Sequence, residues 1–66
     1  MPGLTRSRLM RLHEVVQLTG VSRSTIYRWM ANEEFPKQIS LGANTVAWLE
    51  SDVEDWIQRR IGNRWF

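Results

Sequence analysis

A chain of 66 residues is long enough for one domain, and at that length folding buries only about 60% of the surface that the unfolded chain exposes, so a deep catalytic pocket is not expected. The chain has no cysteine and a single histidine, His13, which argues against disulfides and metal sites. No apolar run approaches the roughly 18 residues of a membrane span, and the N-terminus MPGLTRSRLM lacks the apolar segment of a secretory signal. We therefore expect a cytoplasmic protein that is no enzyme and holds no cofactor or metal.

The net charge of +2 is unevenly distributed along the chain. Residues 1–32 contain five arginines and one glutamate, residues 33–58 contain one lysine and six acidic residues, and residues 59–66 contain three arginines. A chain polarised in this way can present a basic face to a polyanion and keep an acidic face in water. Eight of the nine basic residues are arginine, whose planar guanidinium suits paired contacts with phosphate or guanine.

The N-terminal third predicts an arm followed by a helix. Residues 1–7 are polar and read as a flexible basic arm, and residues 8–11 predict a short extended piece. Apolar residues then follow the i, i+3, i+4 spacing of one helical face, at Leu12, Val15 and Val16. We expect this helix to stop near Thr19, because Gly20 suits the left-handed residue just after a helix end.

A second helix is predicted to follow Ser22, whose side chain is a good N-cap. Its core-facing residues are Ile26, Trp29 and Met30, with Val21 packing beside them. Its outward residues are Arg23, Ser24, Tyr27, Arg28 and Ala31. The helix is expected to end near Asn32, because the residue before a proline, here Phe35, is pushed out of the helical region.

The next segment, KQISLGANTVAWL, predicts a β-hairpin. Apolar and polar residues alternate on both sides of Gly42-Ala43-Asn44, which reads as a three-residue loop. A third helix then begins at a capping box formed by Ser51 and Glu54. Its buried stripe is Val53, Trp56, Ile57 and Ile61, and Gly62-Asn63 ends it.

The predicted elements follow the order helix, tight turn, helix, hairpin, helix. This order predicts a mainly α fold with a small β-hairpin, the winged helix-turn-helix. We expect it to form one domain over residues 1–66. In this fold the second helix enters the major groove of DNA, with residues near its N-terminus at the base edges. The major groove carries a readable pattern of donors and acceptors. We therefore expect sequence-specific binding of double-stranded DNA.

Three segments also carry a resemblance to a known family: RLMRLHEVVQLTGVSRSTIYRWM, FPKQISLG and VAWLESDVEDWI. In this order and spacing, residues 8–61 resemble the AlpA family of small phage and prophage regulators. Those regulators are similar in layout to MerR-type and excisionase-type winged helix-turn-helix domains. The resemblance implies DNA binding near prophage integrase or excision genes. Many relatives carry an arginine at the hairpin tip, where this chain offers only the hydrogen-bonding amide of Asn44.

The candidate DNA contacts are Arg23, Ser24, Thr25, Tyr27, Arg28, Lys37, Asn44 and Arg8. Arg23, at the first helical position, can reach a base edge, and a bidentate contact with guanine is worth about 1–3 kcal/mol of discrimination. Each residue type also has a purely structural interpretation. The arginines can be solvated helix or tail residues, Thr25 a tolerated first-turn residue, and Tyr27 a packing aromatic. The acidic residues 52–55 fit the first turn of a helix without any ligand.

The tryptophans Trp29, Trp48 and Trp56 fall on predicted core faces and are interpreted as structural. Trp65-Phe66 either folds back on the core or forms a dimer contact.

Three functions fit the sequence. The first is a small prophage-type transcriptional regulator. The second is an excisionase that bends attachment-site DNA and recruits an integrase, and the third is a protein-interaction module that does not bind DNA. For DNA binding we expect a homodimer or tandem copies, since half-site spacing mirrors protein symmetry. The operator sequence and the choice between activation and repression stay open.

Overall fold

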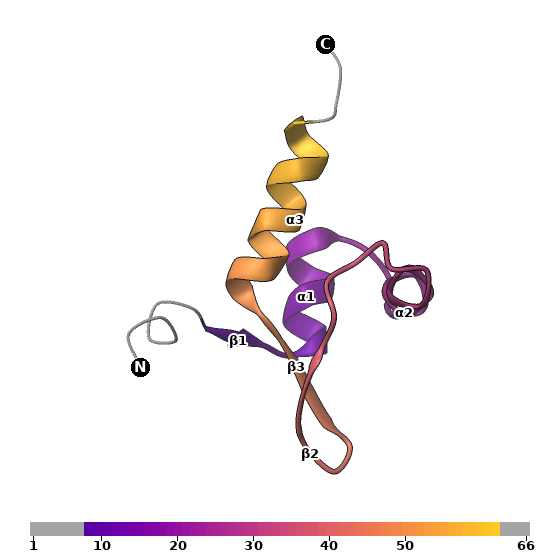
Figure 1. Ribbon diagram of the computed structural model, residues 1–66, viewed down its shortest axis with the longest axis vertical. Helices are drawn as coiled ribbons and strands as arrows, with labels where there is room; N and C mark the ends of the chain where they lie inside the picture. Colours follow the sequence, from indigo (N-terminus) through magenta and orange to yellow (C-terminus); the bar gives the residue numbers. More distant parts are fainter. Residues whose placement is uncertain (1–7, 63–66) are drawn as a thin grey trace.

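The computed structural model describes residues 8–62, so the predicted arm at residues 1–7 and the Trp65-Phe66 pair lie outside the described residues. Within the described part, three helices combine with one small antiparallel sheet (Figure 1). The elements in chain order are β1 (Leu9–Met10), α1 (Leu12–Thr19), α2 (Arg23–Ala31), β2 (Ile39–Gly42), β3 (Thr45–Leu49) and α3 (Glu50–Gly62). The expected mainly helical fold with a β-hairpin is confirmed at this level.

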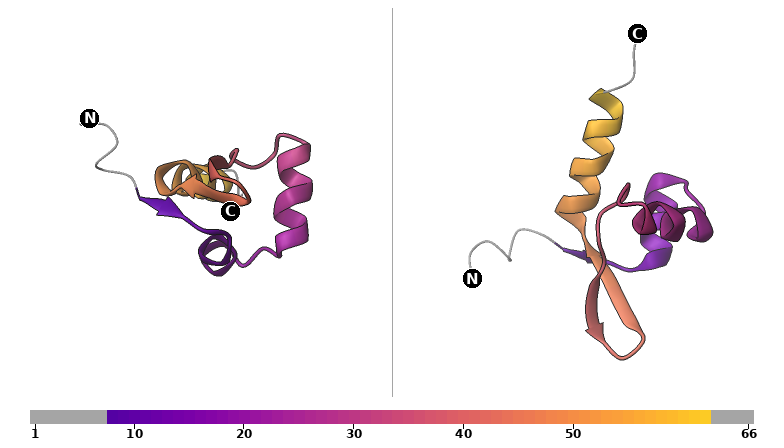
Figure 2. Two further views of the ribbon diagram at one scale, coloured as in Figure 1. Left: turned by 90° about the horizontal axis from the view of Figure 1, so that it is seen from below. Right: turned by 45° about the vertical axis from the view of Figure 1, so that its right-hand side comes forward.

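The turn between α1 and α2 is fixed by local hydrogen bonds. Gly20 adopts φ 74°, as predicted, and its N–H donates to the Val16 carbonyl over 2.8 Å. The Thr19 hydroxyl donates to the Val15 carbonyl over 2.8 Å and accepts from the Val21 N–H over 3.1 Å. The two helices consequently lie at a steep angle to each other (Figure 2).

The boundaries of α2 follow the predicted signals. The Ser22 hydroxyl accepts from the Thr25 N–H over 3.3 Å, which confirms the N-cap. Asn32 is the C-cap, and the chain then leaves the helix through Glu33 at φ 60°. The Glu34 N–H donates back to the Trp29 carbonyl over 2.7 Å, so the departing loop stays on the helix end.

The sheet has one strand more than the predicted hairpin. β3 is the middle strand and pairs with β1 at Leu9↔Leu49 and Met10↔Trp48, so the order is β1-β3-β2. The middle position explains why Ala47 is buried together with Trp48, although the alternating pattern had placed them on opposite faces.

The predicted three-residue loop of the hairpin is wrong. Gly42 belongs to β2 and pairs with Thr45, which leaves a two-residue turn of Ala43 and Asn44. A register shift between Ser40 and Gly42 takes up the extra residue as a bulge. Asn44 turns the chain at φ 58°, a conformation that asparagine tolerates better than most residues.

The start and the far end of α3 also differ from expectation. The helix begins at Glu50, directly after β3, and therefore before the predicted cap at Ser51. The Glu50 N–H donates to the Arg8 carbonyl over 2.7 Å, so a neighbouring strand end satisfies this amide. Ile61, predicted in the buried stripe, is 45% exposed, whereas Val53 is fully buried.

The core lies between the sheet and the inner faces of the helices. Its buried members are Met10, Val15, Ile26, Phe35, Trp48 and Val53. Trp48 is fully buried, as predicted, and its indole N–H donates to the Pro36 carbonyl over 3.1 Å. Trp29 and Trp56 are only half-buried at the edge of the core.

A cation joins the end of α2 to α3. The Arg60 guanidinium lies 4.8 Å from the ring centroid of Trp56 and 5.6 Å from that of Trp29. The Glu34 carbonyl accepts from the Trp56 indole N–H over 2.9 Å and from Arg60 Nη2 over 3.5 Å. This Arg60 clamp holds α2, its following loop and α3 in one arrangement. None of the helices in residues 8–62 has the length and apolar character needed to cross a membrane.

Candidate nucleic-acid interface

The outward face of α2 is the one predicted from the sequence. Its exposed residues are Arg23, Ser24, Tyr27, Arg28 and Ala31, whereas Ile26 is buried and Trp29 and Met30 are half-buried. At 3.6 residues per turn, the exposed residues fall within an arc of about 140°. α2 contains no acidic residue, so this face carries two arginines with no carboxylate among them.

Two polar residues of α2, Thr25 and Tyr27, make contacts that stabilise the fold. Thr25 is half-buried, and its hydroxyl accepts from Ser22 Oγ over 3.0 Å as part of the N-cap. Tyr27 is 39% exposed and sets its ring edge-on to the buried Trp48 ring, with centroids 6.5 Å apart. Ser24 stands on the exposed face with its Oγ 3.5 Å from Ser22 Oγ. Tyr27 is therefore both a packing aromatic and a surface residue.

A hollow of about 540 Å³ brings α2 together with the hairpin and the start of α1. Arg23 and Tyr27 line it from α2, Asn44 from the hairpin turn, and Arg11 and His13 from the start of α1. Leu12 and Val46 supply its apolar lining. We call it the basic hollow, because two arginines line it and no acidic residue does. Three predicted contact residues, from two separate elements, thus meet in one place.

Arg11 and His13 were not among the candidate contacts named from the sequence, in which Arg6, Arg8 and Arg11 form either a basic arm along the DNA backbone or a solvated tail. Both precede the recognition segment by ten residues or more, and no local spacing links them to the hairpin tip. The only available signal was a basic residue at the start of the first helix. Only the tertiary structure shows that this residue lines the same hollow as Arg23 and Asn44.

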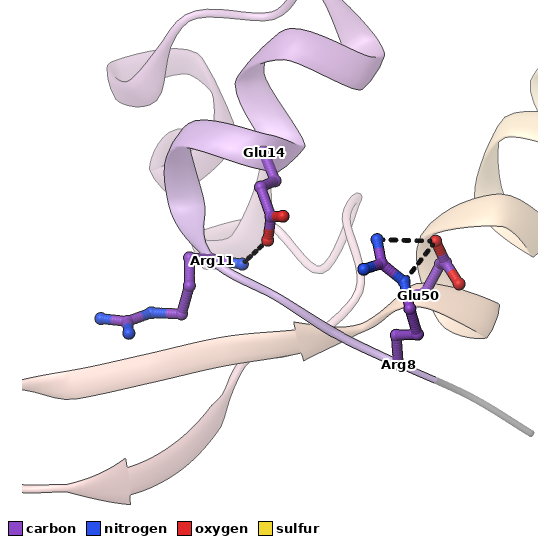
Figure 3. Close-up of polar contacts among 4 residues, drawn as sticks. All are labelled: Arg8, Arg11, Glu14 and Glu50. Carbon is purple, nitrogen blue, oxygen red and sulfur yellow. Dashed lines mark hydrogen bonds and ion pairs between the residues drawn. The ribbon is translucent and has the colours of Figure 1, made fainter. Parts of the chain in front are cut away.

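Arg8 lies apart from this group and is already paired. Its Nε and Nη2 both donate to Glu50 Oε2 over 3.3 Å (Figure 3). This hydrogen bond, followed by the charges of Glu50 and Glu14, raises the pKa of the Arg8 guanidinium above its ordinary value. Arg8 precedes β1, which lies on the opposite side of the molecule from α2 (Figures 1 and 2).

Lys37 lies in a different hollow, of about 520 Å³. That hollow is lined by four carboxylates, Glu33, Glu34, Asp52 and Asp55, and by the cations Lys37, Arg59 and Arg60. Arg59 is held there by Asp55, with Nη2 and Oδ2 3.1 Å apart. We call it the mixed-charge hollow. The structure therefore does not bring Lys37 together with Arg23, Tyr27 and Asn44.

Comparison of the chain with known proteins shows the family to which it belongs. Residues 8–61 match the model of the prophage CP4-57 regulatory protein AlpA. The chain belongs to the AlpA family. It is 48% identical to the uncharacterized protein ORF88 of Enterobacteria phage P4 over 64 residues, which cover 97% of this chain and 73% of the relative. It is 37% identical to the DNA-binding transcriptional activator AlpA of Escherichia coli (strain K12) over 59 residues, which cover 80% of this chain and 84% of the relative.

The resemblance read from the sequence is thereby confirmed for nearly the whole described part of this AlpA-family protein. The phage P4 relative and the prophage regulator described by the family model fit the phage and prophage origin that the resemblance implied. The family is one of regulatory proteins and not of enzymes.

Proposed function

We propose that this AlpA-family protein binds double-stranded DNA sequence-specifically with the outward face of α2, as a small phage-type transcriptional regulator. The observation that carries this function is the exposed arc of α2, which holds Arg23, Ser24, Tyr27 and Arg28 without any acidic residue. Phosphates repel carboxylates, so an acid-free basic helix face is what a duplex requires. The Escherichia coli relative is a DNA-binding transcriptional activator, which supports the same function for this chain.

In this function, α1, the Gly20 turn and α2 form a helix-turn-helix, and the β2–β3 hairpin forms a wing beside it. A major groove about 12 Å wide admits an α-helix, and the N-terminal residues of α2 meet the base edges. The steep angle between α1 and α2 leaves the outward face of α2 uncovered by α1 (Figure 2). The Arg60 clamp and the Tyr27–Trp48 contact hold α2 against the body of the protein.

The residues of α2 divide into reading and positioning contacts. Arg23, at the first helical position, reads a base edge, and Arg28 neutralises a phosphate further along the helix. Ser24 and the Tyr27 hydroxyl donate to phosphates. Thr25 lies beside the exposed arc and contributes through its own O–H, since its oxygen accepts from Ser22.

Asn44, Arg8 and Lys37 have weaker support as contacts. Asn44 stands at the hairpin tip, where its amide can reach the backbone beside the groove. Arg8 already donates from Nε and Nη2 to Glu50, whose negative charge competes with a phosphate for the guanidinium. Lys37 shares its hollow with four carboxylates, which compete with a phosphate for its charge. We therefore expect these residues to contribute less affinity than Arg23 and Arg28.

A selection of bound sequences from random duplexes, followed by binding measurements on Arg23→Ala, tests this function. The wild type should enrich a defined site, and Arg23→Ala should lose about 1–3 kcal/mol of discrimination at one base pair. Arg59→Ala is the matched control, because Arg59 is an exposed arginine already paired with Asp55. An Arg23→Ala variant with unchanged specificity would show that another residue reads the bases, and failure to enrich any duplex would exclude the function.

The same selection reports stoichiometry. One recognition helix reads one half-site, so we expect paired or tandem sites repeated at about 10 bp, one turn of the duplex. Measured bending of an attachment site, with dependence on an integrase and no effect at a promoter, would favour an excisionase over a transcriptional regulator.

A further inference from the structure

The basic hollow and the mixed-charge hollow are similar in volume but differ in charge, and the difference selects the one that suits an anion. The mixed-charge hollow has four carboxylates against three cations. The basic hollow has Arg11 and Arg23 and no carboxylate. An anion entering the first meets net repulsion, whereas an anion entering the second meets two positive charges.

Arg11 is held in place through its backbone, and its side chain is free of carboxylates. Its N–H donates to Glu14 Oε1 over 2.8 Å, and its carbonyl accepts from the N–H groups of Glu14 and Val15. Figure 3 shows the Arg11 guanidinium directed away from the Glu14 carboxylate and from the Arg8–Glu50 pair. Among the residues that the structure describes, no carboxylate forms an ion pair with Arg11 or Arg23.

The remaining polar groups of the basic hollow are all able to donate. Asn44 offers its side-chain amide and Tyr27 its hydroxyl, and the His13 ring carries an N–H in either protonation state. These donors come from three elements, the start of α1, α2 and the hairpin turn. A volume of about 540 Å³ lies within the range of pockets that enclose small organic ligands, roughly 300–1,000 Å³.

We infer that the basic hollow receives one sugar-phosphate unit of the duplex backbone, with Arg11 as its principal charge partner and Asn44 as a donor from the hairpin. This inference rests on the proposed DNA binding by α2. Phosphates border the major groove. The basic hollow joins Arg23 and Tyr27 of the outward arc of α2 to Arg11 and Asn44 beside it, so it lies where a backbone would pass. Contacts of this kind fix the register of the protein on the duplex without reading sequence.

The division of labour between the two arginines of the basic hollow follows from their positions. Arg23 belongs to both the outward arc of α2 and the hollow, so it can reach toward a base. Arg11 belongs to the hollow alone and lies outside α2. Substituting Arg11 should therefore weaken binding to all duplexes alike, whereas substituting Arg23 changes the preferred sequence.

The test combines an Arg11 variant with duplexes in which single phosphates are replaced by neutral methylphosphonates. Wild-type protein should lose affinity when one particular phosphate is neutralised, and Arg11→Ala should lose little more at that same position, because the two changes remove one contact. Arg11→Ala should also lower the magnitude of the slope of log K against log salt by about 0.9. Arg11→Lys should restore the slope, since it restores the charge.

Arg11→Ala keeps the backbone bonds that begin α1, and a circular dichroism melt checks that it folds. Arg59→Ala, in the mixed-charge hollow, should behave as the wild type at every phosphate. An Arg11→Ala variant with the wild-type slope and the wild-type sensitivity at every phosphate would overturn the inference while DNA binding stands. Absence of duplex binding by the wild type would instead remove the proposed function and this inference with it.

Discussion

At the scale of single residues, the use of an arginine depends on what its guanidinium already contacts. Arg8 is bound to Glu50, Arg59 to Asp55, and Arg60 to two tryptophan rings. Arg23 and Arg11 have no such partner among residues 8–62. In the sequence these five arginines are chemically equal, and only the fold distinguishes them. We therefore propose DNA contacts for the arginines whose guanidinium groups have no partner in the described part of the protein, and residue type alone does not identify them.

Two isoleucines on helices provide a test of the core at the residue scale. Ile26 is fully buried and Ile61 is 45% exposed. Ile26→Ala should lower the free energy of unfolding by about 2–5 kcal/mol, because it removes buried methylenes and leaves a cavity. Ile61→Ala should change the free energy of unfolding by no more than about 0.5 kcal/mol. Urea titrations followed by circular dichroism measure both.

If Ile26→Ala does not fold at all, Ile26→Val replaces it, with an expected loss of about 0.5–1.5 kcal/mol. Equal losses for the two alanine variants would mean that Ile61 is covered in solution, contrary to its exposure in this structure.

At the scale of elements, features with local signals were predictable and features made by distant pairing were not. Gly20 at φ 74° and the Ser22 cap follow from residue type and position alone, as does the outward face of α2. Strand β1 exists because Leu9 and Met10 meet Leu49 and Trp48, far along the chain. The early start of α3 depends on the same pairing of β1 with β3, since the Arg8 carbonyl accepts a hydrogen bond from the Glu50 N–H.

The N-cap of α2 gives a matched pair of serines. Ser22→Ala removes the acceptor of the Thr25 N–H and should cost about 1 kcal/mol of unfolding free energy, within a usual range of about 0.5–2. Ser24→Ala, on the exposed face two residues later, should stay within about 0.5 kcal/mol. Thermal melts of the two variants side by side compare them. A Ser22→Ala variant as stable as Ser24→Ala would contradict the capping role.

At the scale of the whole molecule, the basic and acidic segments of the sequence form two different regions of the surface. The acidic residues of the loop after α2 and of α3 line the mixed-charge hollow, together with Lys37. The basic hollow and the outward face of α2 lie together, joined through Arg23. The charge runs of the sequence therefore anticipated a polarised surface, with Lys37 inside the acidic segment of residues 33–58. The prediction of Lys37 as a DNA contact did not take this grouping into account.

Salt dependence of duplex binding measures this polarity directly. If Arg11 and Arg28 each neutralise one phosphate, while Arg23 contacts a base, log K should fall against log salt with a slope of about −1.8. Fluorescence anisotropy at several salt concentrations determines the slope. A flat response would favour a protein-interaction module over a DNA-binding protein, and a much steeper slope would bring Arg8 or Lys37 among the phosphate contacts.

The Arg60 clamp has a consequence for the dissociation of the proposed DNA complex. Ring faces and a backbone carbonyl hold this cation. None of these partners takes up a proton on acidification, so lowering the pH removes no partner of Arg60. Salt concentrated enough to dissociate the proposed duplex complex should leave the angle between α2 and α3 unchanged, because the Arg60 clamp contains no carboxylate. The proposed binding face of α2 would then keep its position after dissociation, so a second binding event would require no refolding.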